Sequence, residues 1–501
     1  MYIDDLIHSP ASHIADFARK QVELYRNDVS LQDYFEAVQV DVQRTPENPY
    51  RNRQVSNRLL NFAVRGADKF SRLLPRQKIK ADVLFCPPPY FVRKTENQFL
   101  IRSLLGLARA DAKILCLLPA YASCRDEMSA QLEAEGRRGQ VIFLDPNSPL
   151  NRTEARLNWR VAQIRARAAF DKTVEILESD GLNPSEEAMA GFERLAYFVE
   201  LWERLEPSIE FEAVVARCHW AALCSPVCRT ARERGKRVVT FQQGVIGHSL
   251  DVPITNSKYV AFGQPSVSFL SRLNGRFCEA VGASDPRVEY VTGGSLFDTI
   301  ADLPDQFDRQ TLLIVDTQVE KGDFYGVGKQ CQELLHVAER LLASNLPLRR
   351  VIIRPHPYWS SLDLEDCQQL VRDHVDRCEL SHPVLSLEDD LRRSSVVMGI
   401  FSGVLTVASA CGLPTIFLES ENGYSTGDLA CFGPGQTLQP DVALCEIGKM
   451  LTDRQAYAEA RSQALRNASE YYAGGSALDP NGAFFERLLR TGPPTSIIGT
   501  N

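Results

Sequence analysis

The sequence lacks the cysteine pairs that mark small metal or redox centres. Its 13 cysteines are scattered from Cys86 to Cys445, and no two of them are spaced as C-x-x-C. Cys224 and Cys228 are one helical turn apart, but His219 alone does not complete a metal site. We therefore expect no metal and no cofactor, and we expect reduced, buried thiols, which indicate a reducing compartment.

An excess of basic charge is also missing. The 56 Lys and Arg residues are outnumbered by 64 Asp and Glu residues, and the formal net charge is -8. Proteins that bind nucleic acid through its phosphates normally carry the opposite balance. No nucleic-acid partner is therefore expected.

Long apolar runs are absent as well. Segments such as Val396–Phe401 are far too short to cross a bilayer. Residues Met1–His13 carry acidic side chains and no basic stretch followed by an apolar one, so no signal peptide is visible. We expect a cytoplasmic protein, and peripheral contact with the cytoplasmic face of an inner membrane stays open.

What the sequence does contain is a long alternation of short apolar strands with amphipathic helices. Such alternation predicts parallel sheets covered by helices on both faces. The 501 residues, 44% of them hydrophobic, favour two or three domains. The expected strands are Ala81–Cys86, Ala112–Leu118, Gln140–Leu144, Phe211–Ala216, Arg237–Gln242, Lys258–Phe262, Val288–Thr292, Thr311–Asp316, Arg350–Arg354, Val396–Phe401 and Thr415–Leu418.

The predicted organisation is two Rossmann-like domains that face a cleft. A helical extension occupies residues 1–80, and the first domain spans 81–300 with a long helical insertion at 150–205. The second domain spans 301–490, and the tail at 491–501 is expected to be disordered.

In open parallel sheets, ligands bind beyond the carboxyl ends of the strands. Ser402 and Gly403 lie where an apolar strand meets a helix, so they could bind phosphate at the helix N-terminus. Arg354 and His356 follow another strand, and the prolines on either side of His356 fix its backbone, which suits recognition of an anion. Glu419 ends the strand after the Ser402 helix and could bind the hydroxyls of a ribose.

A fourth candidate is the glycine-rich loop after the strand that ends at Gln242. We expect Gln242, Gln243 and Gly244 to contact a sugar or acceptor, and His248 and Asp251 to supply catalytic groups. Weaker candidates at strand ends are Glu96, for the acceptor, and Asp316.

In their order and spacing, these segments resemble the bacterial capsule polysaccharide biosynthesis proteins. Relatives of that family include Kdo transferases, polysialyltransferases and CDP-glycerol glycerophosphotransferases. The resemblance covers roughly residues 210–420. It is carried by Gln242-Gln243-Gly244, Val291–Asp298, Arg354-Pro355-His356-Pro357, and the stretch from Phe401-Ser402-Gly403 to Gly412-Leu413-Pro414.

The resemblance implies a GT-B type glycosyltransferase. It would move an acidic sugar, Kdo-like or sialic-acid-like, from a CMP-activated donor to a growing capsule or lipopolysaccharide glycan or glycolipid. It also implies that the His356 and Ser402 turns bind the nucleotide phosphates, with His356 contributing to catalysis. Gln243 stands where many relatives have His, so the catalytic role falls to His248 or Asp251. The alternatives are a sugar-nucleotide 2-epimerase that uses a UDP-sugar and a non-catalytic partner in polysaccharide assembly.

Overall fold

The computed structural model describes most of the chain from residue 78 to residue 490. The predicted N-terminal extension, apart from residues 78–80, and the predicted tail lie outside the described residues. The described ranges are 78–87, 94–118, 124–146, 152–178, 189–218, 223–242, 244, 246, 258–281, 288–296, 303–316, 327–355, 364–381, 386–400, 402–418, 432, 437–473 and 482–490.

The first large sheet is parallel throughout and is covered on both faces. Along β2 (Val83–Cys86), Val83 and Phe85 point to one core, with α5 (Lys94–Arg109) and α6 (Cys124–Ala134), while Leu84 and Cys86 point to the other. Burial on both faces explains why the central strand β2 is apolar at every position rather than alternating with polar residues. The strand order is β4 (Val141–Leu144), β3 (Ile114–Leu117), β2 (Val83–Cys86), β6 (Ala213–Ala216), β7 (Arg237–Phe241), β8 (Lys258–Ala261) and β9 (Glu289–Thr292).

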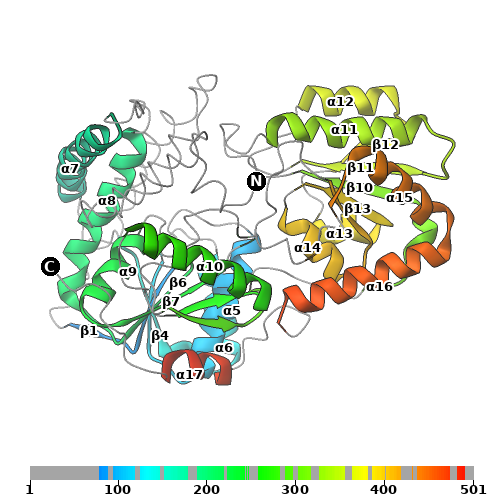
Figure 1. Cartoon of the computed structure of the whole chain (residues 1–501). Coiled ribbons are helices and arrows are strands. Elements are labelled where there is room, and N and C mark those ends of the chain that lie inside the picture. The colour runs from blue at the N-terminus through cyan, green and yellow to red at the C-terminus, as the bar shows by residue number, and fades with distance from the viewer. Residues whose placement is uncertain are drawn as a thin grey trace.

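Two long helices form a hairpin on one side of this sheet (Figure 1). They are α7 (Arg152–Glu178) and α8 (Met189–Leu205), which pack against each other along their length. Trp202 of α8 is buried beside α9 (Cys224–Glu233), and its indole donates a hydrogen bond to Thr230 at 3.0 Å. The helical character predicted for residues 150–205 is thus present in both described helices. Next to them, β1 (Ile79–Lys80) pairs with β5 (Ile209–Glu210).

The second sheet has the same construction. In β10 (Thr311–Val315), Leu312 and Ile314 point towards α11 (Val327–Ala343) and α15 (Pro440–Thr452), whereas Leu313 and Val315 point towards α14 (Gly403–Ala410). Its strands, all parallel, are β12 (Cys378–Leu380), β11 (Arg350–Arg354), β10 (Thr311–Val315), β13 (Val396–Gly399), β14 (Thr415–Leu418) and β15 (Thr437–Leu438). The predicted α/β class with two Rossmann-like domains is confirmed.

The two domains meet at the carboxyl end of β8. The carbonyl of Phe262 accepts a hydrogen bond from Gly294 N at 3.0 Å and another from Ala473 N at 2.7 Å. Gly294 precedes the chain's passage into the second domain, and Ala473 follows α16 (Arg454–Tyr471), the long helix that runs back towards the first domain (Figure 1). A Cβ added at Gly263 would lie 2.3 Å from the carbonyl oxygen of Tyr471, so the contact admits no side chain there.

The last helix belongs to the first domain, which corrects the predicted boundary at residue 490. α17 (Gly482–Arg490) packs on α5, and Phe485 and Leu488 join the core on that face of the first sheet. A Cβ added at Gly106 of α5 would lie 2.2 Å from the Phe485 ring. The physical reason is that the apolar side of α17 covers part of the first sheet's core, a contact that local sequence does not reveal.

Replacement of Phe485 by Ala should therefore destabilise the protein by about 3–5 kcal/mol, the usual cost of deleting a buried aromatic ring. Phe485 is fully buried. Denaturant unfolding measures the change, with Leu465→Ala as the control because Leu465 is 42% exposed. Equal stabilities of the two variants would contradict the placement of α17.

Candidate functional site

The second sheet has one point at which the strand order changes direction. From β10 the chain moves outward to β11 and β12, and then returns to β13 beside β10 and continues to β14 and β15. The connections leave β10 and β13 in opposite directions, and such a divergence opens a crevice at the carboxyl ends of the two strands. Asp316 follows β10 directly, and Ser402 and Gly403 lie three and four residues after the end of β13.

Ser402 and Gly403 form the start of α14, as the sequence predicted. Ser402 is extended (φ -153°, ψ 136°), and its hydroxyl accepts a hydrogen bond from Val404 N at 3.3 Å, so it is the N-cap. The first turn of α14 carries no acidic residue. Leu405 N also donates to the Ser402 carbonyl at 3.1 Å, so the N–H of Gly403 and the positive end of the helix dipole are what would favour an anion at this point.

The space in front of Gly403 is open. In the described part of the chain, a Cβ added at Gly403 would meet no atom within 4 Å. By contrast, a Cβ added at Gly399, at the end of β13, would lie 2.8 Å from a methyl group of Val315. Gly399 is thus required by packing, whereas Gly403 leaves room for a ligand to approach the backbone.

Arg354 is placed at the end of β11 but is engaged within the protein. Its guanidinium lies 2.5 Å from the carboxylate of Asp390, a fully buried residue of α13 (Leu387–Arg392), and 3.2 Å from the Ser381 hydroxyl. Ser381 also donates to Asp390 at 2.5 Å. Because Ser381 follows β12, these contacts direct Arg354 towards the β12 side, away from β13. A buried carboxylate needs such a partner, so Arg354 has a structural role in addition to any contact with a ligand.

Gln242 is likewise taken up by protein contacts. Its side chain is buried; its carbonyl oxygen accepts from Phe262 N at 2.7 Å, and its amide donates to the Gly244 carbonyl at 2.9 Å. The same amide lies 3.3 Å from the hydroxyl of Tyr471, at the end of α16. Gln242 therefore fixes the start of the glycine-rich loop and ties it to the domain junction. A Cβ at Gly244 would meet nothing within 4 Å of it in the described residues.

Several predicted site residues are beyond what the structure describes. Glu96 lies in the first turn of α5, but its side chain is not described. The others fall outside the described residues altogether: Gln243, His248, Asp251, His356 and Glu419.

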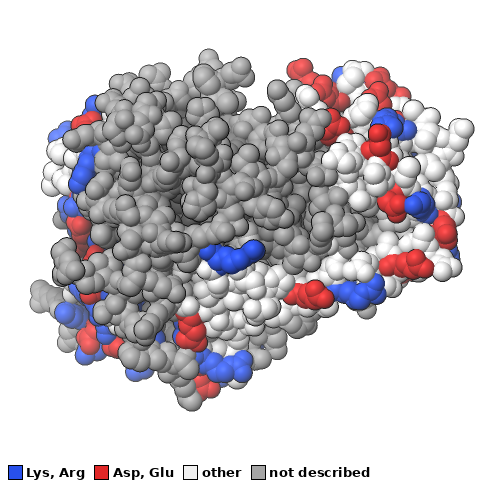
Figure 2. All heavy atoms as spheres, viewed as in Figure 1, with Lys and Arg blue, Asp and Glu red and all other residues white. Residues whose placement is uncertain are grey.

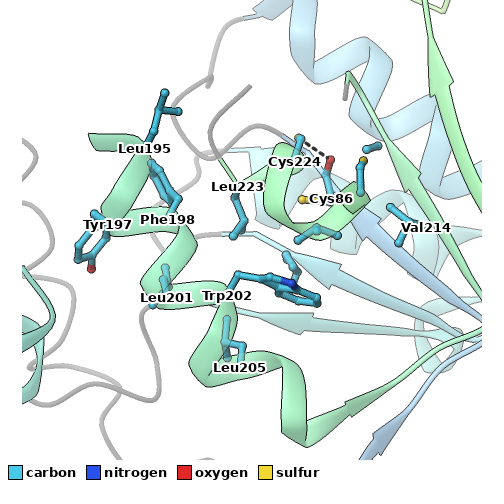
Figure 3. Packing of buried hydrophobic residues seen from close by; sticks show 14 of the residues in the cluster. Cys86, Leu195, Tyr197, Phe198, Leu201, Trp202, Leu205, Val214, Leu223 and Cys224 are labelled. Atoms are coloured by element: carbon cyan, nitrogen blue, oxygen red, sulfur yellow. Dashed lines mark hydrogen bonds between the residues drawn. The ribbon is translucent and has the colours of Figure 1, made fainter. Parts of the chain in front are cut away.

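The equivalent crevice of the first sheet has a different lining. There the order changes between β2, which ends at Cys86, and β6, which is followed two residues later by Cys218. Both thiols are buried, and the thiol of Cys224 donates to the carbonyl of Cys86 at 3.3 Å (Figure 3). Burial raises the pKa of Cys86 and Cys224, so these groups stay protonated. Neutral thiols are weak donors and offer an anion little, which favours the second sheet for a phosphate-bearing ligand.

Other features of the described residues bear on ligands and partners. No group of three or more His, Cys, Asp or Glu side chains among them is arranged to hold a metal ion. None of the helices found there is long and apolar enough to span a bilayer. On the face drawn in Figure 2, acidic and basic side chains of the second domain are interspersed.

No protein-family model matches the chain, and no curated protein sequence matches it. Among solved structures, it is similar to TarM of S. aureus in complex with UDP, at a TM-score of 0.47 and 10% identity, covering 82% of this chain and 100% of that one. It is also similar to a UDP-GlcNAc 2-epimerase from Neisseria meningitidis (TM-score 0.45, 12% identity, 82% and 100% covered) and to MurG from Acinetobacter baumannii (0.40, 11%, 81% and 99%). Likeness at this level does not transfer an activity or a ligand.

Because the space at Gly403 is open, we expect a substitution there to affect nucleotide binding but not the stability of the fold. Gly403→Ala should leave stability within about 1 kcal/mol, because Ala is accepted in the first turn of a helix. The added methyl group should lower the affinity for nucleotides at least tenfold, as measured by calorimetry.

Gly399→Ala is the matched control, and it should instead lower the melting temperature, because its methyl group collides with Val315. A folded Gly403→Ala protein with unchanged nucleotide affinity would show that no ligand lies against this turn.

Proposed function

We propose that the chain is a glycosyltransferase that binds a nucleotide-sugar donor between the carboxyl ends of β10 and β13. The observation that carries this proposal is the open space before Gly403, at the N-terminus of a helix that begins at the direction change of a parallel sheet. This combination suits a diphosphate or phosphate better than any other common ligand group.

The chemistry required of such a site is stabilisation of a departing nucleotide. Glycosyl transfer breaks the bond between the anomeric carbon and a phosphate oxygen, and negative charge develops on that oxygen. The backbone N–H of Gly403 at the start of α14 can donate a hydrogen bond to it without reorganising, and the positive end of the helix dipole adds to this stabilisation. His356, two residues after Arg354, would add a donor, and Ser402 would contact the phosphate.

Glu419 is proposed to bind the ribose. It follows β14, which lies beside β13 with Phe417 opposite Gly399. The register therefore brings the end of β14 to the same edge as the α14 turn, and a carboxylate there can accept hydrogen bonds from two ribose hydroxyls.

The acceptor and the catalytic base are proposed to lie on the first domain. The loop after β7 starts from the fixed Gln242 and contains Gln243, Gly244, His248 and Asp251, while Glu96 begins the helix after β2. In this proposal His248 or Asp251 acts on the acceptor or the reacting sugar.

The finer part of the proposal is the identity of the donor and acceptor. The resemblance to capsule polysaccharide proteins supports a CMP-activated acidic sugar, Kdo-like or sialic-acid-like, and a surface glycan or glycolipid as acceptor. The protein would act in the cytoplasm, in peripheral contact with the inner membrane. Exposed Leu157, Val161 and Ile164 on α7 would give that contact an apolar surface, and co-sedimentation with anionic vesicles would test it.

A panel of nucleotides separates the candidate functions. We expect CMP or CDP to raise the melting temperature and UDP to have little effect. At a nucleotide concentration one hundred times the dissociation constant, binding raises the free energy of unfolding by about 2.7 kcal/mol. If UDP is the one nucleotide that stabilises the protein, a CMP-activated donor is rejected and the sugar-nucleotide 2-epimerase function is favoured. If no nucleotide stabilises the protein, the result supports the third candidate function, a non-catalytic partner in polysaccharide assembly.

His356 gives a sharper test of the active-site assignment. His356→Ala should lower kcat/KM by about 30- to 800-fold, which corresponds to roughly 2–4 kcal/mol, the scale of one deleted preorganised donor. Melting temperature should change little. His336→Ala, on the exposed side of α11, is the control; a lower melting temperature with full specific activity for His356→Ala would instead identify a packing residue.

A further inference from the structure

Two adjacent tyrosines end α16, and both are buried at the domain junction. The rings of Tyr471 and Tyr472 have no exposed area, and they contact the ring of Phe262 at centroid distances of 5.9 and 5.4 Å. Phe262 belongs to the first domain and the tyrosines to a helix that packs on α14 of the second. Their hydroxyl groups therefore lie within contact distance of both domains.

The hydroxyl of Tyr472 is directed to α14. It lies 2.7 Å from the hydroxyl of Thr406, which is itself buried and donates to the carbonyl of Gly403 at 2.8 Å. Because the single proton of Thr406 goes to Gly403, Tyr472 is the donor in the bond between the two hydroxyls. The first turn of α14 is thus held through the Gly403 carbonyl and the Thr406 side chain.

The hydroxyl of Tyr471 is directed to the other domain. It lies 3.3 Å from the side-chain amide of Gln242, which in turn donates to the carbonyl of Gly244 at 2.9 Å. Consecutive residues of one helix end therefore contact the two segments that the proposed function requires: the donor-binding turn through Thr406, and the glycine-rich loop through Gln242. The centroids of the two rings lie 5.1 Å apart and the rings are almost perpendicular, an edge-to-face contact that packs the tyrosines against each other.

We infer that Tyr471 and Tyr472 are positioning residues that set the donor-binding turn against the glycine-rich loop. This inference rests on the proposed function for its catalytic consequence. Neither hydroxyl touches substrate; each acts through another residue, Tyr472 through Thr406 and Tyr471 through Gln242. A displacement of either segment would misalign the donor with the acceptor, and small misplacements are costly in group transfer.

The first test uses the protein without ligand. Tyr472→Phe keeps the ring and removes only the hydroxyl, so we expect amide hydrogen exchange in α14 to become at least fivefold faster, with the rest of the second sheet unchanged. Thr406→Val should accelerate exchange in α14 in the same way, whereas Thr406→Ser, which keeps the hydroxyl, should retain slow exchange. Exchange in the double variant Tyr472→Phe/Thr406→Val should be no faster than in either single variant.

Tyr457→Phe is the matched control, because Tyr457 is also buried on α16 but packs on Phe307 instead. Unchanged exchange in Tyr472→Phe, or equal acceleration in Tyr457→Phe, would overturn the inference.

The second test separates the two tyrosines. Tyr472→Phe should weaken nucleotide binding three- to tenfold, whereas Tyr471→Phe should leave that affinity intact and lower kcat by a similar factor. Equal effects of both variants on both quantities would show a general loss of packing and would refute the positioning roles. Failure of the wild-type protein to bind any nucleotide refutes the proposed function instead, and the exchange experiment in the ligand-free protein still decides whether the pair holds α14.

Discussion

A single backbone carbonyl, that of Phe262, accepts hydrogen bonds from both segments that connect the two domains. A carbonyl oxygen has two lone pairs, and here Gly294 and Ala473 use both. No side-chain substitution can remove this acceptor. The arrangement in turn demands glycine at position 263, fixes the end of α16 and brings Tyr471 and Tyr472 against the Phe262 ring. The relation between the candidate donor and acceptor segments depends on this one junction.

Most of the fold could be predicted because the strands are buried on both faces. Continuous apolar runs such as Thr311–Val315 and Val396–Gly399 stand out from the polar loops around them. The described strands that escaped prediction are all short: β12 has three residues, one of them Glu379, and β1, β5 and β15 have two each. The destination of α17 also escaped, because its partner α5 lies nearly the whole chain away and no local pattern encodes that contact.

In the candidate site, too, local features could be predicted from the sequence and contacts between distant residues could not. A serine before a glycine at a strand end predicts an N-cap, and Ser402 is one, since capping involves only neighbouring residues. Partners distant in sequence were not foreseeable: Arg354 finds Asp390, and Gln242 finds Phe262 and Tyr471. Thr406 was overlooked because a lone threonine in an apolar helix has no distinctive sequence signal. Its importance lies in a hydroxyl partner contributed by residue 472.

The return of α17 to the first domain affects the order in which the protein can mature on the ribosome. The first sheet and α5 are made early, yet the part of their core that contains Phe485 is completed only after the whole second domain has been translated. At about 5–20 residues per second, synthesis of the chain between the end of the first sheet and α17 lasts on the order of ten to forty seconds. During that interval the nascent first domain exposes an apolar strip on α5, at the site where α17 will bind. Binding by a chaperone, or premature pairing with a neighbouring chain, would compete with α17 for this strip.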